Sequence, residues 1–199
     1  MVTGNRATTG TISDILSDIH AQGLRATQIV DRNRTMLRGH DALEKKPIDL
    51  HAVVNESLAL VAHDMDARQV RTTVVLPVFP CIISGDEVLL QQVFVNLIMN
   101  ATDAMAATPP PERRLTIRSE VRVAEVEVSV RDNGTGVPPE VIDRLFSPFL
   151  TTKSLGLGIG LTIVRKIVEA HGGSIAASNN PDGGATFVVT LPRSRTSGE

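Results

Sequence analysis

The sequence predicts an α+β domain in which helices cover one face of a mixed β-sheet. Residues 115–121 and 124–130 are adjacent runs of alternating apolar and polar residues, which is typical of an antiparallel strand pair. Two long helical patterns, 86–106 and 160–171, flank this pair and separate it from further strand-like runs. Strands interrupted by long helices indicate the α+β class.

The composition is that of a soluble globular protein. Hydrophobic residues make up 42% and charged residues 21% of the 199 residues, and the formal net charge is −2. This charge gives no reason to expect nucleic acid or a membrane surface as a partner of this chain. No apolar run is long enough to span a bilayer, and the single Cys81 leaves no disulfide framework. We therefore expect a cytoplasmic setting, with a membrane anchor of a parent protein left open.

Before the predicted domain, residues 12–38 have the pattern of one long amphipathic helix. Residues 1–11 are small and polar and are expected to form a disordered tail, and Gly39 is expected to end the helix. A lone helix of this length cannot bury its apolar stripe, so it needs a partner helix from another chain or from missing sequence. Residues 39–48 then form a polar linker.

The main domain is expected to span residues 49–192, followed by a tail at 193–199. Its expected elements are a helix at 49–63, a strand at 70–76, a helix at 86–106, a proline-rich turn at 107–114, strands at 115–121 and 124–130, a glycine- and proline-rich stretch at 132–160, a helix ending near 171, and strands at 174–178 and 185–191.

The first candidate site cluster is a polar stripe on the helix at 91–105. At 100° per residue, Gln92, Asn96, Asn100 and Asp103 fall within about 80° of arc, and most of the remaining circumference is apolar. The polar groups of such a stripe either form hydrogen bonds with neighbouring loops or face a ligand. A hydrated Mg²⁺ is a ligand that suits the side-chain oxygens. The stripe alone leaves both readings open.

The second cluster is Asp132-Asn-Gly134-Thr-Gly136, directly after a predicted strand. The two glycines allow a tight turn with a ligand close to the backbone. A carboxylate at this place accepts hydrogen bonds and suits an exocyclic amine such as that of adenine. An ordinary Asx turn explains the same residues.

The third cluster is the glycine-rich stretch Gly156-x-Gly158-x-Gly160, which leads into a helix and follows Lys153. Backbone N–H groups at a helix start form an anion site suited to phosphates, although a flexible loop before a helix has the same appearance. Residue 161 is Leu, so the G-x-G-x-x-G pattern of a dinucleotide fold is absent, and the sequence has no G-x-x-x-x-G-K-[ST] phosphate loop.

Five motifs in this order resemble the catalytic domain of sensor histidine kinases, within the superfamily of gyrase, Hsp90, histidine kinase and MutL. The resemblance covers residues 48–192 and rests on Asn100-Ala101 with Asp103, Asp132-x-Gly134-x-Gly136, Phe146-x-x-Phe149-x-Thr151-Thr152-Lys153, Gly156-x-Gly158-x-Gly160-Leu161, and Gly183-Gly184-Ala185-Thr186-Phe187. Leu150 stands where an aromatic residue is common in the family.

The resemblance implies a two-layer Bergerat-type α/β sandwich that binds ATP and Mg²⁺, with residues 138–156 as a lid over the nucleotide. By position, it implies that Asn100 binds Mg²⁺ beside Asp103, that Asn96 shapes the phosphate end, and that the phosphates are met by Lys153, Gly156, Gly158, Gly160 and Leu161. It implies that Asp132 accepts a hydrogen bond from the adenine amine, with Thr186 near the same contact through water, and that Gly134 and Gly136 allow close approach of the nucleotide. Phe146 and Phe149 are implied to anchor the lid.

The type of reaction depends on one residue of the polar stripe. In the ATPase branches of the resembled superfamily, a glutamate one turn before the magnesium-binding asparagine activates water. That position here is Asn96, an amide that cannot take a proton. We therefore expect phosphoryl transfer to histidine, with Asn96, Asn100 and Lys153 as catalytic residues.

The phosphorylated histidine itself is not evident. The resemblance implies a histidine on the first helix of a dimerising hairpin, followed by an acidic residue, yet His20 precedes Ala21 and His40 lies in the linker. We interpret residues 12–38 as the second hairpin helix, so a fragment lacking its own acceptor is expected. Its expected partners are the phosphoacceptor hairpin of a homodimeric parent kinase and a response regulator receiver domain. An inactive nucleotide-binding scaffold and an anti-sigma-type serine kinase are the alternatives.

Overall fold

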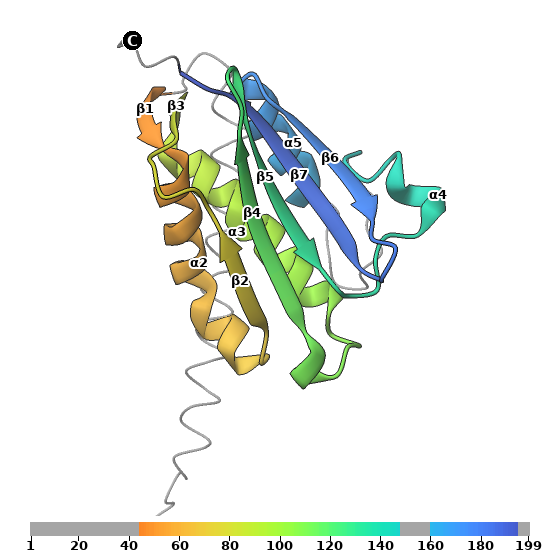
Figure 1. Ribbon diagram of the computed structural model, residues 1–199. Coiled ribbons are helices and arrows are strands. Elements are labelled where there is room, and N and C mark those ends of the chain that lie inside the picture. Colours follow the sequence, from red (N-terminus) through yellow and green to blue (C-terminus); the bar gives the residue numbers. More distant parts are fainter. Residues whose placement is uncertain (1–43, 148–159, 195–199) are drawn as a thin grey trace, which may run out of the picture. The chain divides into compact units, whose positions relative to one another are not determined.

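The computed structural model describes residues 44–147 and 160–194 (Figure 1). The predicted helix 12–38 and both predicted tails lie outside these residues, apart from the start of the C-terminal tail, so those boundaries stay predictions. The elements are β1 (Lys46–Asp49), α2 (Leu50–Ala67), β2 (Arg71–Val75), β3 (Ile82–Gly85), α3 (Glu87–Ala104), the 3₁₀ turn η2 (Pro110–Glu112), β4 (Arg114–Val121), β5 (Glu125–Asp132), α4 (Pro139–Ile142), α5 (Gly160–Ala170), β6 (Ser174–Asn179) and β7 (Ala185–Pro192).

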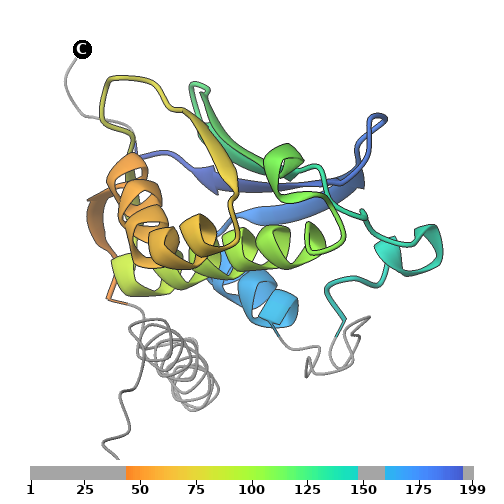
Figure 2. The same ribbon diagram turned by 90° about the horizontal axis from the view of Figure 1, so that it is seen from below.

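Five of the strands form one mixed sheet in the order β2-β4-β5-β7-β6. The β2–β4 pair is parallel, and the other three pairs are antiparallel. Figure 2 shows α2, α3 and α5 as one layer beneath this sheet, with α3 between the other two helices. The predicted α+β architecture, a sheet covered by helices on one face, is therefore confirmed.

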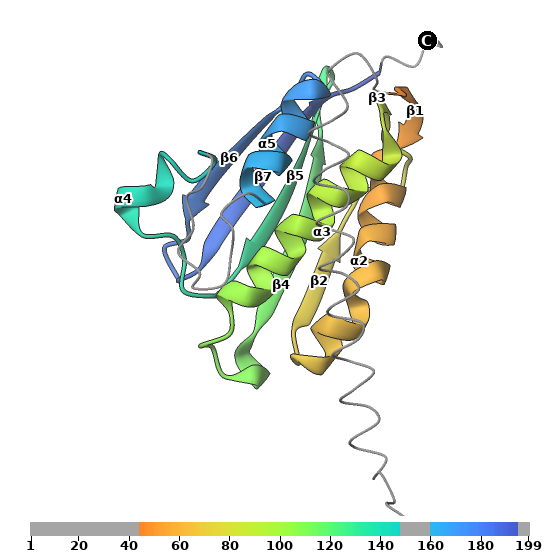
Figure 3. The ribbon, with the colours of Figure 1, turned by 180° about the vertical axis from the view of Figure 1, so that it is seen from behind.

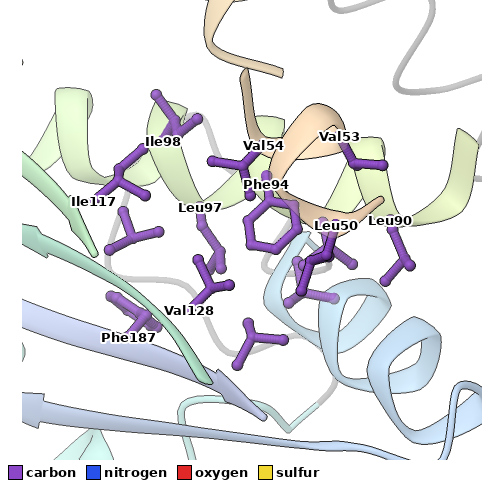
Figure 4. Close-up of a cluster of buried hydrophobic side chains, with 14 of the residues drawn as sticks. Leu50, Val53, Val54, Leu90, Phe94, Leu97, Ile98, Ile117, Val128 and Phe187 are labelled. Carbon is purple, nitrogen blue, oxygen red and sulfur yellow. The ribbon is translucent and has the colours of Figure 1, made fainter. Parts of the chain in front are cut away.

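The core lies between the helix layer and the sheet because every second residue of the central strands points toward the helices. In β5 the inward positions Val126, Val128 and Val130 are fully buried, and Asp132 continues the same alternation at the strand end. From the helix side, Phe94 and Leu97 of α3 reach into the same cluster (Figure 4). The polar residue Asp132 therefore lies at the rim of an apolar core.

The start of α3 is fixed by two capping contacts. Asp86 accepts hydrogen bonds from the backbone N–H groups of Val88 and Leu89, at 3.1 and 3.2 Å. The Asp86 N–H itself donates to Nε2 of His171 over 2.9 Å, and Nδ1 of His171 lies 2.7 Å from the Ile167 carbonyl oxygen. These contacts fit a neutral imidazole, and burial lowers the pKa of His171. The end of α5 is thereby tied to the beginning of α3.

The structure contains two strands and one short helix that were not predicted from the sequence. β1 and β3 have four residues each and pair with one another as a separate two-stranded sheet, so the last part of the predicted linker is a strand. α4 occupies residues 139–142, inside the stretch that was expected to be irregular. Seen from behind in Figure 3, α4 lies beside the β6 edge, away from α2 and β2.

Candidate functional site

The polar stripe of α3 lies on the side of the helix that faces away from the sheet. Asn96 and Asn100 are half-buried, as are Gln92 and Asp103, whereas the opposite side of the helix is buried. The buried residues of that opposite side include Leu90, Val93, Phe94, Leu97, Ile98 and Ala101. Asp103 forms an ion pair of 2.7 Å with Arg68, the residue that follows α2. The predicted amide stripe therefore exists, and its acidic member is anchored to the neighbouring helix.

The start of α5 lies beside this stripe. A Cβ atom placed on Gly160, the first residue of α5, would be 3.8 Å from Oδ1 of Asn96. The first turn of a helix carries unpaired backbone N–H groups and the positive end of the helix dipole. The structure therefore brings Asn96 and a potential anion-binding helix end together, as the third sequence cluster requires. Half-buried Leu161 follows in the same turn.

The carboxylate of Asp132 is buried at the other end of the stripe, with 2% of the residue exposed. One carboxylate oxygen, Oδ1, accepts from the backbone N–H groups of Gly134 at 2.8 Å and Ala185 at 3.3 Å. Burial raises the pKa of Asp132, and these two hydrogen bonds and nearby Arg131 counteract that rise. A further hydrogen-bond donor would stabilise the ionised form of this buried carboxylate.

Gly134 is required by close packing rather than by an unusual backbone angle. A Cβ atom at this position would lie 2.5 Å from the carbonyl carbon and oxygen of Ala104 and 2.9 Å from the Met105 nitrogen. The next N–H group, that of Thr135, donates to the Ala104 carbonyl over 3.1 Å. The loop after β5 is therefore packed directly on the last turn of α3.

These contacts give the site an elongated form along α3. Asn96 lies beside the start of α5, and Ala104, eight residues later, contacts Gly134. Eight residues of α-helix span about 12 Å. A ligand along this face would meet an acceptor for an amine at one end and an anion-binding helix start at the other, with the Asn100 amide between them.

Thr186 does not lie on the same side of the sheet as the Asp132 carboxylate. Thr186 pairs with Arg131 in the β5–β7 ladder, and directly paired residues point to the same face. Asp132 is the next residue of β5 and points to the opposite face. The Thr186 hydroxyl donates to Oδ1 of Asn180 over 2.6 Å, and the backbone of Ala185 is what contacts the carboxylate.

Several predicted site residues lie outside the described part of the chain, namely Lys153, Gly156, Gly158, Phe149 and Leu150. Phe146 is described, and its carbonyl oxygen accepts from the Thr162 hydroxyl of α5 over 3.3 Å. A hollow of about 400 Å³ lies elsewhere, between the beginning of α2 and the loop after β2. Among the described residues, no helix is long and apolar enough to cross a membrane.

Comparison with known proteins gives consistent results. Residues 85–195 match the family described as histidine kinase-, DNA gyrase B-, and HSP90-like ATPase. The chain is 39% identical over 173 residues to the sensor protein FixL of Bradyrhizobium diazoefficiens, an alignment that covers 86% of this chain and 34% of FixL. The chain thus spans about a third of the length of this relative.

Solved structures resemble the fold as well. The catalytic domain of the histidine kinase ThkA has a TM-score of 0.68 and 30% identity, covering 75% of this chain and 96% of that domain. The complex of ThkA with the response regulator protein TrrA matches 99% of this chain and 55% of the ThkA chain, with a TM-score of 0.68 and 23% identity. At that identity the second match speaks for the fold alone.

Proposed function

Because the chain belongs to the histidine kinase-, DNA gyrase B- and HSP90-like ATPase family, as an ATP-binding catalytic domain of the sensor histidine kinase type, we propose that it transfers the γ-phosphoryl group of ATP to a histidine side chain. One observation carries the proposal. The buried Asp132 carboxylate and the start of α5 lie at opposite ends of one amide-bearing face of α3.

At the adenine end, Asp132 accepts a hydrogen bond from the exocyclic amine of the base. The carboxylate already holds two backbone donors on Oδ1, and burial makes a further donor favourable. Gly134 lets the loop after β5 pack against the Ala104 backbone, and Gly136 has a φ of +70°, with Oδ1 of Asn179 only 2.9 Å from where its Cβ atom would lie. Both glycines therefore shape the loop beside the adenine contact. Thr186 takes part, on this proposal, only through Asn180, whose Oδ1 accepts from the Thr186 hydroxyl.

At the phosphate end, Asn96, Asn100 and the start of α5 hold the triphosphate, with Lys153, Gly156 and Gly158 completing the site. The described residues contain no group of three His, Cys, Asp or Glu side chains that could hold a metal. This fits Mg²⁺, which is commonly shared between few protein oxygens, substrate phosphates and water. The amide of Asn100, beside Asp103, would be its protein ligand. When bound, Mg²⁺ neutralises charge on the transferred group.

The chemistry favours transfer over hydrolysis because Asn96 stands where hydrolases of this superfamily have a glutamate. An amide cannot accept a proton from water. A neutral imidazole needs no base to attack: its ring nitrogen forms the new bond to phosphorus while the bond to the ADP oxygen breaks. Positioning of the nucleotide by Asp132 and the face of α3 then supplies the catalysis.

Of the three described histidines, His51 and His171 are only 5% and 3% exposed and are hydrogen-bonded inside the domain, so neither can reach a nucleotide. His63 is exposed on α2, an element of the catalytic domain itself. We propose that the acceptor belongs to the dimerising hairpin of a parent kinase. We also propose a response regulator receiver domain as the next acceptor, the kind of partner present in the ThkA–TrrA complex.

Calorimetric titration with ATP and ADP, with and without Mg²⁺, tests the nucleotide site. Saturable binding that tightens with Mg²⁺ supports it, and absence of binding in a folded sample would contradict it. Incubation with ATP and a separate histidine-bearing hairpin then tests the reaction. Phosphate on the hairpin histidine identifies a kinase, and free phosphate alone identifies a hydrolase. The absence of both products would favour an inactive scaffold.

A further inference from the structure

The end of β5, which carries Asp132, lies directly against the turn between β6 and β7. A Cβ atom on Gly184 would lie 2.2 Å from the Asp132 carbonyl oxygen and 2.7 Å from the Asn133 Cα atom. Gly184 also has a φ of +79°, a conformation that favours glycine. The two segments are therefore in backbone contact, and the position of one constrains the other.

Asn180, in this turn, bonds to the backbone of the residue that carries the adenine-binding carboxylate. Its Nδ2 donates to the Asp132 carbonyl oxygen over 2.8 Å. Its Oδ1 accepts from the Thr186 hydroxyl over 2.6 Å, which fixes the orientation of the amide. The backbone N–H of Asn180 donates to the Gly184 carbonyl over 2.9 Å, so the asparagine is itself held in place.

The preceding residue holds the far end of the loop after β5. Oδ1 of Asn179 accepts from the Val137 N–H over 2.8 Å, and Nδ2 of Asn179 donates to the Val137 carbonyl over 2.7 Å. This amide thus pairs with both backbone groups of one residue, as a neighbouring strand would. Asp132 and Val137 are each held by one of the two asparagines.

We propose that Asn180 is a positioning residue for adenine recognition, acting through Asp132; this rests on the proposed ATP site. The carboxylate is attached to the backbone that Asn180 holds, and the Ala185 N–H on its Oδ1 comes from the same turn. Loss of the Asn180 amide releases the Asp132 carbonyl and leaves the carboxylate less well directed toward an amine. Thr186 contributes by orienting that amide, which gives its hydroxyl a role on the outer face of the sheet.

The test compares ATP with inosine triphosphate, which carries a carbonyl oxygen in place of the adenine amine. In Asn180→Ala we expect ATP to bind about 5- to 10-fold more weakly, as for loss of one hydrogen bond. Binding of inosine triphosphate should change by less than about twofold, because it offers no amine to Asp132. The preference for ATP over inosine triphosphate therefore falls by nearly the full factor.

Asn179→Ala is the matched control, because it removes two hydrogen bonds to the same loop but at Val137. This variant should weaken the binding of both nucleotides by similar factors and keep the preference for ATP over inosine triphosphate. Equal losses for both nucleotides in Asn180→Ala as well would assign Asn180 a purely structural role and overturn the proposal. If Asn180→Ala does not fold, as judged by circular dichroism, Thr186→Val replaces it, with a smaller drop in preference expected and an unchanged preference counting against us.

A failure of the proposed function can be distinguished from a failure of this inference. A wild-type protein that binds no ATP, or binds both nucleotides equally, removes the adenine assignment of Asp132. A wild-type protein that prefers ATP, together with an Asn180→Ala variant of unchanged preference, removes only the positioning role of Asn180.

Discussion

Replacing Asp132 by Asn separates the requirements of nucleotide binding from those of the fold. The Asn side chain has nearly the same size, and its Oδ1 can still accept from the Gly134 and Ala185 N–H groups. What changes is the second oxygen of Asp132, which becomes an NH₂ group, and the negative charge, which is lost. Against the exocyclic amine of adenine, the variant presents a donor or a neutral acceptor in place of a carboxylate.

The expected loss of affinity follows from the chemistry of that one contact. A hydrogen bond to a charged group contributes about 1.5–3 kcal/mol, which corresponds to a roughly 10- to 150-fold rise in Kd. If the introduced NH₂ group faces the adenine amine, two donors meet and the loss is larger. We therefore expect Asp132→Asn to bind ATP at least about tenfold more weakly than the wild type.

The stability of the free domain should change in the opposite sense. Burial raises the pKa of Asp132 above its ordinary value of 3.8, so the folded state binds this proton more tightly than the unfolded state. The stability linked to the protonated group is complete below that value and is lost as the pH rises through the folded-state pKa. At pH 7 the ionised, buried carboxylate is therefore unfavourable to the free fold, and the amide removes that penalty.

Two measurements on the same samples test this reasoning: titration with ATP and denaturant unfolding without nucleotide, at pH 7 and again near pH 4.5. We expect weaker ATP binding, undiminished stability at pH 7, and a stability advantage of the variant that shrinks at the lower pH. Unchanged ATP affinity would remove the adenine assignment. A variant much less stable than wild type at pH 7 would show that the fold itself depends on the charge.

Three further predictions concern other parts of the domain. Burial lowers the pKa of His171, so its contribution to stability should be present above pH 6.5 and be lost as the pH falls through the folded-state pKa; denaturation between pH 7.5 and 5 should show this loss, and His171→Asn should reduce it. Gly134→Ala should abolish ATP binding and lower the melting temperature, because its Cβ atom meets the Ala104 backbone at 2.5 Å; a variant with wild-type melting and binding would contradict the packing. Asn100→Ala should remove the Mg²⁺-dependent increase in ATP affinity while leaving Mg²⁺-free binding near the wild-type level, as read by calorimetry; a retained Mg²⁺ effect would exclude Asn100 as the ligand.

The main elements of the fold were predictable because their patterns are long. The alternation at 115–121 and 124–130 appears as β4 and β5, and the helix predicted at 86–106 appears as α3. β1 and β3 were missed because four residues are too few to establish a period of two. Their pairing also joins residues far apart in the chain, from Asp49 with Ile82 (82 − 49 = 33 positions) to Lys46 with Gly85 (85 − 46 = 39 positions). Short strands of this kind are fixed by tertiary contacts rather than by local sequence.

The site was predictable in its motifs but not in its connections. Asp132 and Asn96 were identified as candidates from residue type and spacing, and the structure places them toward opposite ends of one helix face. Thr186 was assigned near the adenine contact, yet strand alternation directs its side chain to the other face of the sheet. Asn180 was not identified from the sequence, where it precedes Pro-Asp-Gly-Gly, because nothing local indicates a hydrogen bond to a residue 48 positions earlier.

The buried charge at Asp132 links nucleotide binding to protonation. In the free domain, desolvation favours the protonated carboxyl group, and two backbone donors offset this only in part. An adenine amine is a further donor that can interact well only with an acceptor, so it favours the ionised form and lowers the pKa of Asp132 on binding. By linkage, ATP must then bind more tightly as the pH rises through the pKa of the free protein, and binding in that range must release a proton. The same residue is thus unfavourable to the empty fold and favourable to the complex, which is the behaviour expected of a side chain retained for binding rather than for folding.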